Sequence, residues 1–251
     1  MQNSDYLISE NPMKALVFFS LPMIIGNLFQ QVYTMADSAI VGRLVGENAL
    51  AAVGAAYSLT NIFICIAIGG GIGASVIVSQ YFGRGSYGKL KKAVYTALIS
   101  FLLISGLLGG FGLLFSRKIM VALNTPAEVL DMSVTYLKIY FLGLPFLFMY
   151  NVLSSMFNAL GKSRIPLYFL IFSSVFNIVL DWIFVADFHL DVAGVAWATL
   201  IAQGVSVVGS FTILLKELHT MEGNADGIFA KEELLPMTKI ALPSILQQST
   251  V

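Results

Sequence analysis

Long apolar stretches, separated by short polar segments, dominate the chain. A hydrocarbon core about 30 Å thick needs about 20 helical residues to cross it, because each residue adds about 1.5 Å. Six stretches reach that length and a seventh begins near the last residue; they cover 15–45, 49–79, 93–115, 134–160, 166–185, 192–215 and 240–251. None shows the period-two alternation of a membrane barrel strand. The pattern predicts an all-α membrane protein, with a six-helix transmembrane bundle and the start of a seventh helix.

The longest polar segment, 216–239, separates the sixth stretch from the seventh. We expect it to be a cytoplasmic linker between an N-terminal six-helix lobe, 1–215, and the start of a second lobe, 240–251. This division predicts that the chain holds one lobe and only the beginning of its partner.

An internal repeat supports the division. Lys14 precedes Leu21-Pro22 at the start of the first stretch, and Lys239 precedes Leu242-Pro243 at the start of the seventh. Six spans return the chain to the side on which it began, so a second copy would be related to the first by an axis along the membrane normal.

Composition agrees with a membrane location. Hydrophobic residues make up 57% of the chain and charged residues 11%, whereas soluble proteins average about 25% charged. So few charges cannot cover a soluble surface, and the apolar surface must face lipid. Fourteen basic residues balance fourteen acidic ones, so no net charge attracts nucleic acid.

The basic residues are distributed unequally between the two predicted sides. The richer side should be cytoplasmic, with the N-terminus on that side of a multi-pass plasma-membrane protein. Its basic residues are Lys14, Arg84, Lys89, Lys91, Lys92, Lys162, Arg164, Lys216, Lys231 and Lys239.

Nothing in the sequence supports an enzymatic function. The single Cys65 excludes an internal disulfide framework, and the distant His189 and His219 cannot form a zinc cluster. Hydrolase, metalloprotease and nucleotide-binding motifs are absent, so we assign no catalytic residue, no resident metal and no cofactor.

Polar residues inside the apolar stretches recur at helical spacing. Asn27, Gln30, Thr34 and Asp37 share one face of the first stretch, and Ser173, Asn177 and Asp181 share one face of the fifth. Such residues normally turn away from lipid, which predicts a hydrated cavity. Its candidate substrate-lining residues are Asn27, Gln30, Thr34, Asn151 and Gln203. Amides and hydroxyls also hydrogen-bond between helices as packing contacts, and that alternative stays open.

The two carboxylates are the stronger functional candidates, because an ionisable group inside a membrane is costly. Protonation and cation binding would compete at Asp37 and Asp181. Asn177 and Thr199 can add an amide and a hydroxyl oxygen, which gives an all-oxygen set of the kind that hard cations such as sodium prefer. The residues leave sodium and proton as alternatives. Either aspartate could instead lie near a helix end.

Seven short motifs resemble the multidrug and toxic compound extrusion (MATE) transporters. They are LP (21–22), MADSAIVG (35–42), ALAAVG (49–54), SQYFG (79–83), ALGKSRIP (159–166), NIVLD (177–181) and GVAWAT (194–199). They extend over most of the chain and are most similar to the bacterial and archaeal branch with DinF-like members. The resemblance implies a twelve-helix exporter of two six-helix lobes, of which this chain is the N-terminal lobe.

The resemblance also implies a mechanism. Asp37, Asn177, Asp181 and Thr199 match the positions that form a cation or proton site in the N-terminal lobe of this branch. We therefore expect a sodium- or proton-coupled antiporter that exports organic, cationic or amphipathic compounds by alternating access. Its partners would be small-molecule substrates, the lipid bilayer and the missing C-terminal lobe.

Two other functions remain as alternatives. A lipid-linked oligosaccharide flippase of the same broader superfamily would need a more cationic cavity than these residues provide. A non-transporting membrane scaffold or enzyme would require the polar stripes to serve packing alone.

Overall fold

The computed structural model describes residues 12–223 and 227–250, and all regular structure in these ranges is helical. The elements are α2 (Pro12–Ile40), η1 (Val41–Val45), α3 (Glu47–Gly83), α4 (Tyr87–Ala122), α5 (Ala127–Ala159), α6 (Arg164–Trp182), η2 (Ile183–Asp187), α7 (Asp191–Thr220) and α8 (Lys231–Ser249). The two η elements are single π-helical turns that continue α2 and α6.

Six helices are long and apolar enough to cross a membrane. They are Leu16–Val45, Glu47–Gly83, Tyr87–Ala122, Ala127–Ala159, Arg164–Asp187 and Asp191–Thr220. This confirms the predicted class, an all-α membrane protein with six spans and a further helix after them.

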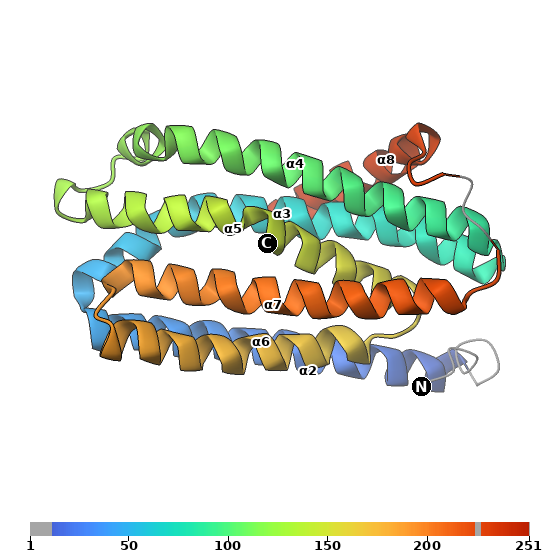
Figure 1. The fold of residues 1–251 in the computed structure, drawn as a ribbon, viewed down its shortest axis with the longest axis horizontal. Helices are drawn as coiled ribbons and strands as arrows, with labels where there is room; N and C mark the ends of the chain where they lie inside the picture. Colours follow the sequence, from blue (N-terminus) through green and yellow to red (C-terminus); the bar gives the residue numbers. More distant parts are fainter. Residues whose placement is uncertain (1–11, 224–226, 251) are drawn as a thin grey trace.

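The spans form an elongated bundle in which successive helices run in opposite directions (Figure 1). In this view α2 and α6 lie along one edge, α7 lies next to them, α5 and α3 come next, and α4 lies along the opposite edge. The connections 84–86 and 160–163 and the segments 221–223 and 227–230 lie at one end of the bundle, and the connections 123–126 and 188–190 lie at the other. Basic residues are therefore gathered at the first of these two ends, in its connecting segments and in the helix ends beside them. We call this end of the bundle the basic end.

Helix α5 forms the centre of the packing, between α3, α4 and α7. Phe141 and Phe148 on this helix are each 1% exposed, and the ring of Phe141 meets that of Phe63 on α3 edge-on at 5.4 Å. Such large apolar side chains are buried inside the bundle, whereas the outer faces of α2 and α4 are exposed. Those faces carry many of the exposed apolar side chains expected of lipid-facing helices.

Helix α8 begins at Lys231. It therefore starts earlier in the chain than the predicted span at 240–251. Its first turn carries Glu232 and Glu233, which interact favourably with the positive N-terminal end of a helix dipole. The hydropathy pattern did not predict this first turn of the helix, because its residues are charged.

Close backbone approach holds α8 against α3. A Cβ added at Gly69 would lie 2.6 Å from the backbone nitrogen of Ile245, and one at Gly73 would lie 2.5 Å from the carbonyl oxygen of Met237. Only glycine fits at these two crossings, so the glycine-rich part of α3 serves helix packing.

Candidate functional site

Two acidic side chains from different helices meet inside the bundle. Asp37 lies in the last turn of α2 and Asp181 lies at the end of α6, each shortly before a π-helical turn. Their carboxyl groups lie within hydrogen-bonding reach of each other. Asp181 is fully buried and Asp37 is half-buried. An ionised carboxylate can only accept hydrogen bonds, so the two groups can bond to each other only when the pair holds a proton.

Asn177 and Thr199 lie beside this pair. Asn177 precedes Asp181 by one turn on the same face of α6, and it is 1% exposed. Its Nδ2 donates to Oγ1 of Thr199 on α7 at 3.2 Å. All four predicted coupling residues therefore belong to one group, contributed by α2, α6 and α7.

Two tyrosines complete the surroundings of the carboxyl pair. Tyr33 on α2 hydrogen-bonds to Thr199 and lies within electrostatic reach of both aspartates. Tyr136 on α5 lies within the same reach. Neither tyrosine was among the coupling residues predicted from the sequence. Tyr33 could have been found, because it precedes Asp37 by one helical turn; Tyr136 lies in an apolar stretch and gave no signal.

Oxygen atoms remain available for a proton, a water molecule or a cation at this group. Oδ1 of Asp37 is buried and meets no N–H or hydroxyl donor within the described part of the chain. Buried polar atoms normally find a partner in protein or ordered water. The group offers carboxylate, amide and hydroxyl oxygens, the ligand types that suit a hard cation.

A small polar cavity of about 50 Å³ adjoins Asn177 and Thr199. Helices α2, α5, α6 and α7 all contribute to its wall, including the polar residues Gln30, Tyr33, Ser174 and Gln203. Ser174 is 2% exposed, and its Oγ has no partner in the described residues. Since one water occupies about 30 Å³ of liquid, the cavity can hold one or two waters beside Asn177 and Thr199.

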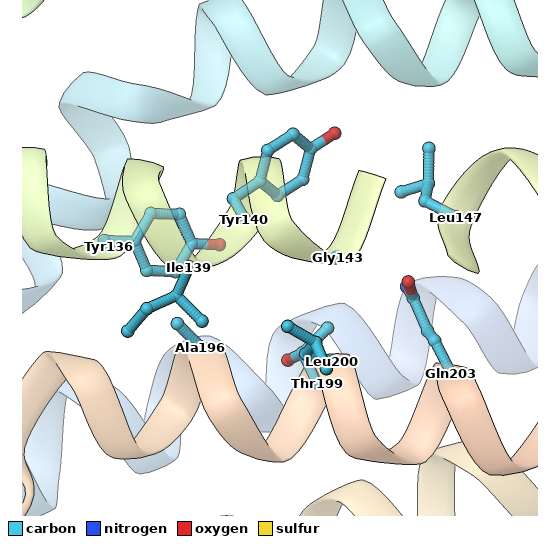
Figure 2. A pocket seen from close by; sticks show the side chains of 9 residues that line it. All are labelled: Tyr136, Ile139, Tyr140, Gly143, Leu147, Ala196, Thr199, Leu200 and Gln203. Atoms are coloured by element: carbon cyan, nitrogen blue, oxygen red, sulfur yellow. The ribbon is translucent and has the colours of Figure 1, made fainter. Parts of the chain in front are cut away.

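A second cavity of about 30 Å³ lies between α5 and α7. Figure 2 shows Tyr136 and Tyr140 of α5 on one side of it and Thr199 and Gln203 of α7 on the other. Thr199 and Gln203 line both cavities, so these two side chains lie between the two spaces.

The predicted substrate-lining residues are only partly brought together. Gln30 and Gln203 line the same cavity. Asn27 and Thr34 are exposed on α2, where the hydroxyl of Thr34 donates to the carbonyl of Gln30. Asn151 is half-buried and donates to the carbonyl of Leu147 on its own helix. These last three residues do not line the two cavities described above.

The fold and this group define a multi-pass membrane protein with acidic and neutral polar side chains assembled between its helices. The chain matches the MatE family over residues 22–183 and belongs to that family. This confirms the resemblance inferred from the short motifs.

Curated relatives of the chain agree with this family assignment. The chain is 30% identical over 245 residues to the "Probable multidrug resistance protein YpnP" of Bacillus subtilis (strain 168), covering 96% of this chain and 54% of the relative. It is 26% identical over 242 residues to the "Multidrug export protein MepA" of Staphylococcus haemolyticus (strain JCSC1435), with the same two shares. The chain spans about half the length of these relatives.

The fold is also similar to that of solved transporters. A structure described as the outward-facing conformation of a multidrug resistance MATE family transporter of the MOP superfamily superposes with a TM-score of 0.90. The sequence identity is 26%, and the match covers 99% of this chain and 55% of that one.

Proposed function

We propose that the chain forms the N-terminal lobe of a cation-coupled antiporter that exports organic compounds by alternating access. The observation that carries this proposal is the contact between the carboxyl groups of Asp37 and Asp181, which come from different membrane-spanning helices. Two ionisable groups that share a proton inside a membrane are costly to maintain without a task. Relatives whose names describe multidrug resistance or export support the choice of cargo.

The coupling step arises from the hydrogen-bond chemistry of the pair. With one proton, the two carboxyl groups bind each other; without it, two adjacent negative charges repel and attract a cation. Sodium would then bind to the carboxylates of Asp37 and Asp181 and to the neutral oxygens of Asn177 and Thr199. Because a ligand shifts a conformational equilibrium only by its differential affinity, proton or sodium binding would favour one state of the lobe over the other.

The proposed cargo is an organic cation or an amphipathic compound. Gln30 and Gln203 supply hydrogen-bonding amides near the carboxyl pair, and Tyr136 and Tyr140 supply aromatic faces suited to an organic cation. Both ionisable groups in the proposed coupling set are acidic, which suits a cation better than the pyrophosphate of a lipid-linked sugar. The basic end would face the cytoplasm in the plasma membrane by the positive-inside rule.

Efflux by the full-length protein tests this function. Proteoliposomes would contain a fluorescent organic cation, and a sodium or a proton gradient would be imposed separately. We expect Asp37→Asn and Asp181→Asn each to lower gradient-driven efflux by at least about tenfold, because the pair can then no longer exchange its charge. Asp131→Asn is the matched control, since the Asp131 side chain is 83% exposed and pairs with Arg117.

The same assay separates sodium from proton coupling. Efflux that requires sodium at constant pH, and is lost in Asp181→Asn, identifies sodium; efflux driven by a pH gradient without sodium identifies the proton. Undiminished driven efflux in Asp37→Asn would falsify the role of the carboxyl pair.

A further inference from the structure

An apolar cavity of about 160 Å³ lies between α3, α4 and α8, separate from the carboxyl pair. Ala97 and Phe101 of α4, Phe148 of α5 and Ile245 of α8 are among the residues that line it. Ser100 and Thr238 are its two hydroxyl residues, and each hydroxyl donates to a carbonyl of its own helix at 2.7 Å. The wall therefore offers water almost nothing to bind, and apolar cavities of this kind stay dry.

The cavity is bordered by apolar side chains of the outer surface. Ile104 of α4 is 47% exposed and Leu242 of α8 is 58% exposed. Ile104 lies at the middle of the membrane-spanning helix Tyr87–Ala122, which places it at the depth of the hydrocarbon core. Lipid hydrocarbon is therefore available at this border at very high local concentration.

Positive charge lies along the same two helices toward the basic end. Lys89 precedes Ala97 on α4 by eight residues, about 12 Å of helix, and lies on the face of α4 that carries Ser100. Lys231 begins α8. Glu232 and Glu233 share that first turn, and Glu233 accepts hydrogen bonds from the hydroxyl of Tyr81 at 2.9 and 3.2 Å. This bond holds the carboxylate of Glu233 against α3, while the lysines favour an anionic group at the membrane surface.

We propose that this cavity binds an acyl chain of an anionic phospholipid, whose phosphate lies near Lys89 and Lys231. The acyl chain fills the space between the apolar side chains and so completes the packing of α8 against α3 and α4. Because it rests on the cavity and on the lysines, this inference is independent of the coupling chemistry at Asp37 and Asp181.

Photocrosslinking of the full-length protein in nanodiscs tests the proposal. The probe is phosphatidylglycerol with a diazirine on its acyl chain, and cross-linked peptides are mapped by mass spectrometry. We expect labels on the 97–104 and 234–245 segments. Ser100→Phe fills the cavity and should lower this labelling about tenfold relative to wild type. Leu114→Phe is the matched control on the same helix, because Leu114 is 81% exposed to the surroundings.

The headgroup is tested by a second pair of probes. Wild-type protein should label more with the phosphatidylglycerol probe than with its phosphatidylcholine equivalent. The double variant Lys89→Gln, Lys231→Gln should abolish this preference while it keeps the position of the labels. Where Ser100→Phe does not give a monodisperse protein, the smaller Ser100→Leu replaces it.

Three results overturn the proposal. Equal labelling in Ser100→Phe and Leu114→Phe means that the lipid does not enter the cavity. Equal labelling by the two headgroups in wild type removes the anionic preference. Labels absent from both segments in wild type mean that another part of the full-length protein covers the opening.

Discussion

The backbone N–H of Ala230 donates to Oγ1 of Thr96 at 2.9 Å, which joins the start of α8 to the buried face of α4. Thr96 is 0% exposed and Ala230 is 7% exposed. Oγ1 of Thr96 also donates to the carbonyl of Lys92 at 2.7 Å, so the hydroxyl both donates and accepts. A second anchor lies nearby, where Nζ of Lys91 donates to the carbonyls of Met221 and Gly223 at 2.9 and 2.7 Å.

Thr96→Val should therefore loosen the attachment of the start of α8 to α4. It keeps the side-chain shape but leaves the buried N–H of Ala230 without an acceptor, at a cost of about 1–3 kcal/mol. Hydrogen exchange measured by mass spectrometry should become faster in residues 227–235. Thr212→Val is the control, because the exposed Thr212 hydroxyl bonds only to Val208 of its own helix. Equal exchange in the two variants would contradict the anchor.

Gly73→Ala should disturb the crossing of α3 and α8. The new Cβ would lie 2.5 Å from the carbonyl oxygen of Met237 and 2.8 Å from the Cβ of Ala241, so α8 must move away. Gly54→Ala is a control on the same helix, since nothing lies within 4 Å of its added Cβ. Gly54→Ala should raise stability by about 0.5–1 kcal/mol through helix propensity, whereas Gly73→Ala should lower the thermal unfolding midpoint. The reverse order would refute the close crossing.

The ion pair between Lys162 and Glu217 should contribute to stability at the basic end. Its side chains are 18% and 20% exposed, so removal of one partner leaves a charge that water solvates only in part. We expect Lys162→Gln to cost about 1–2 kcal/mol. The double variant Lys162→Gln, Glu217→Gln should recover part of that loss, and a double-mutant cycle of unfolding midpoints measures the coupling. Purely additive effects would show that the contact contributes nothing.

Thr199→Val should weaken the binding of the coupling ion. The substitution removes the hydroxyl that accepts from Asn177 and hydrogen-bonds to Tyr33, while it keeps the side-chain volume. In the efflux assay, the concentration of the coupling ion that gives half-maximal rate should rise about tenfold, and Thr199→Ser should restore it. Thr135→Val is the control, because the exposed Thr135 hydroxyl bonds to Asp131 on its own helix. Failure of Thr199→Ser to rescue would assign Thr199 to packing.

Much of this arrangement could be predicted from the sequence. Hydropathy located all six spans because lipid imposes a minimum length on each apolar stretch. Helical spacing placed Asn177 and Asp181 on one face, and the structure adds that this face meets Asp37. The contribution of Tyr136 could not be predicted, because it depends on how α5 packs against α6 and α7. The early start of α8 was also missed, since its first turn is charged and hydropathy does not register dipole or tertiary stabilisation.

The attachment of α8 has a consequence for the order in which the protein is made. Its described partners, among them Gly69, Gly73 and Tyr81 on α3, all precede it in the chain. Because synthesis proceeds from the N-terminus, these partners are already made when α8 is inserted. The earlier spans thus present α8 with a surface on which it can dock during synthesis.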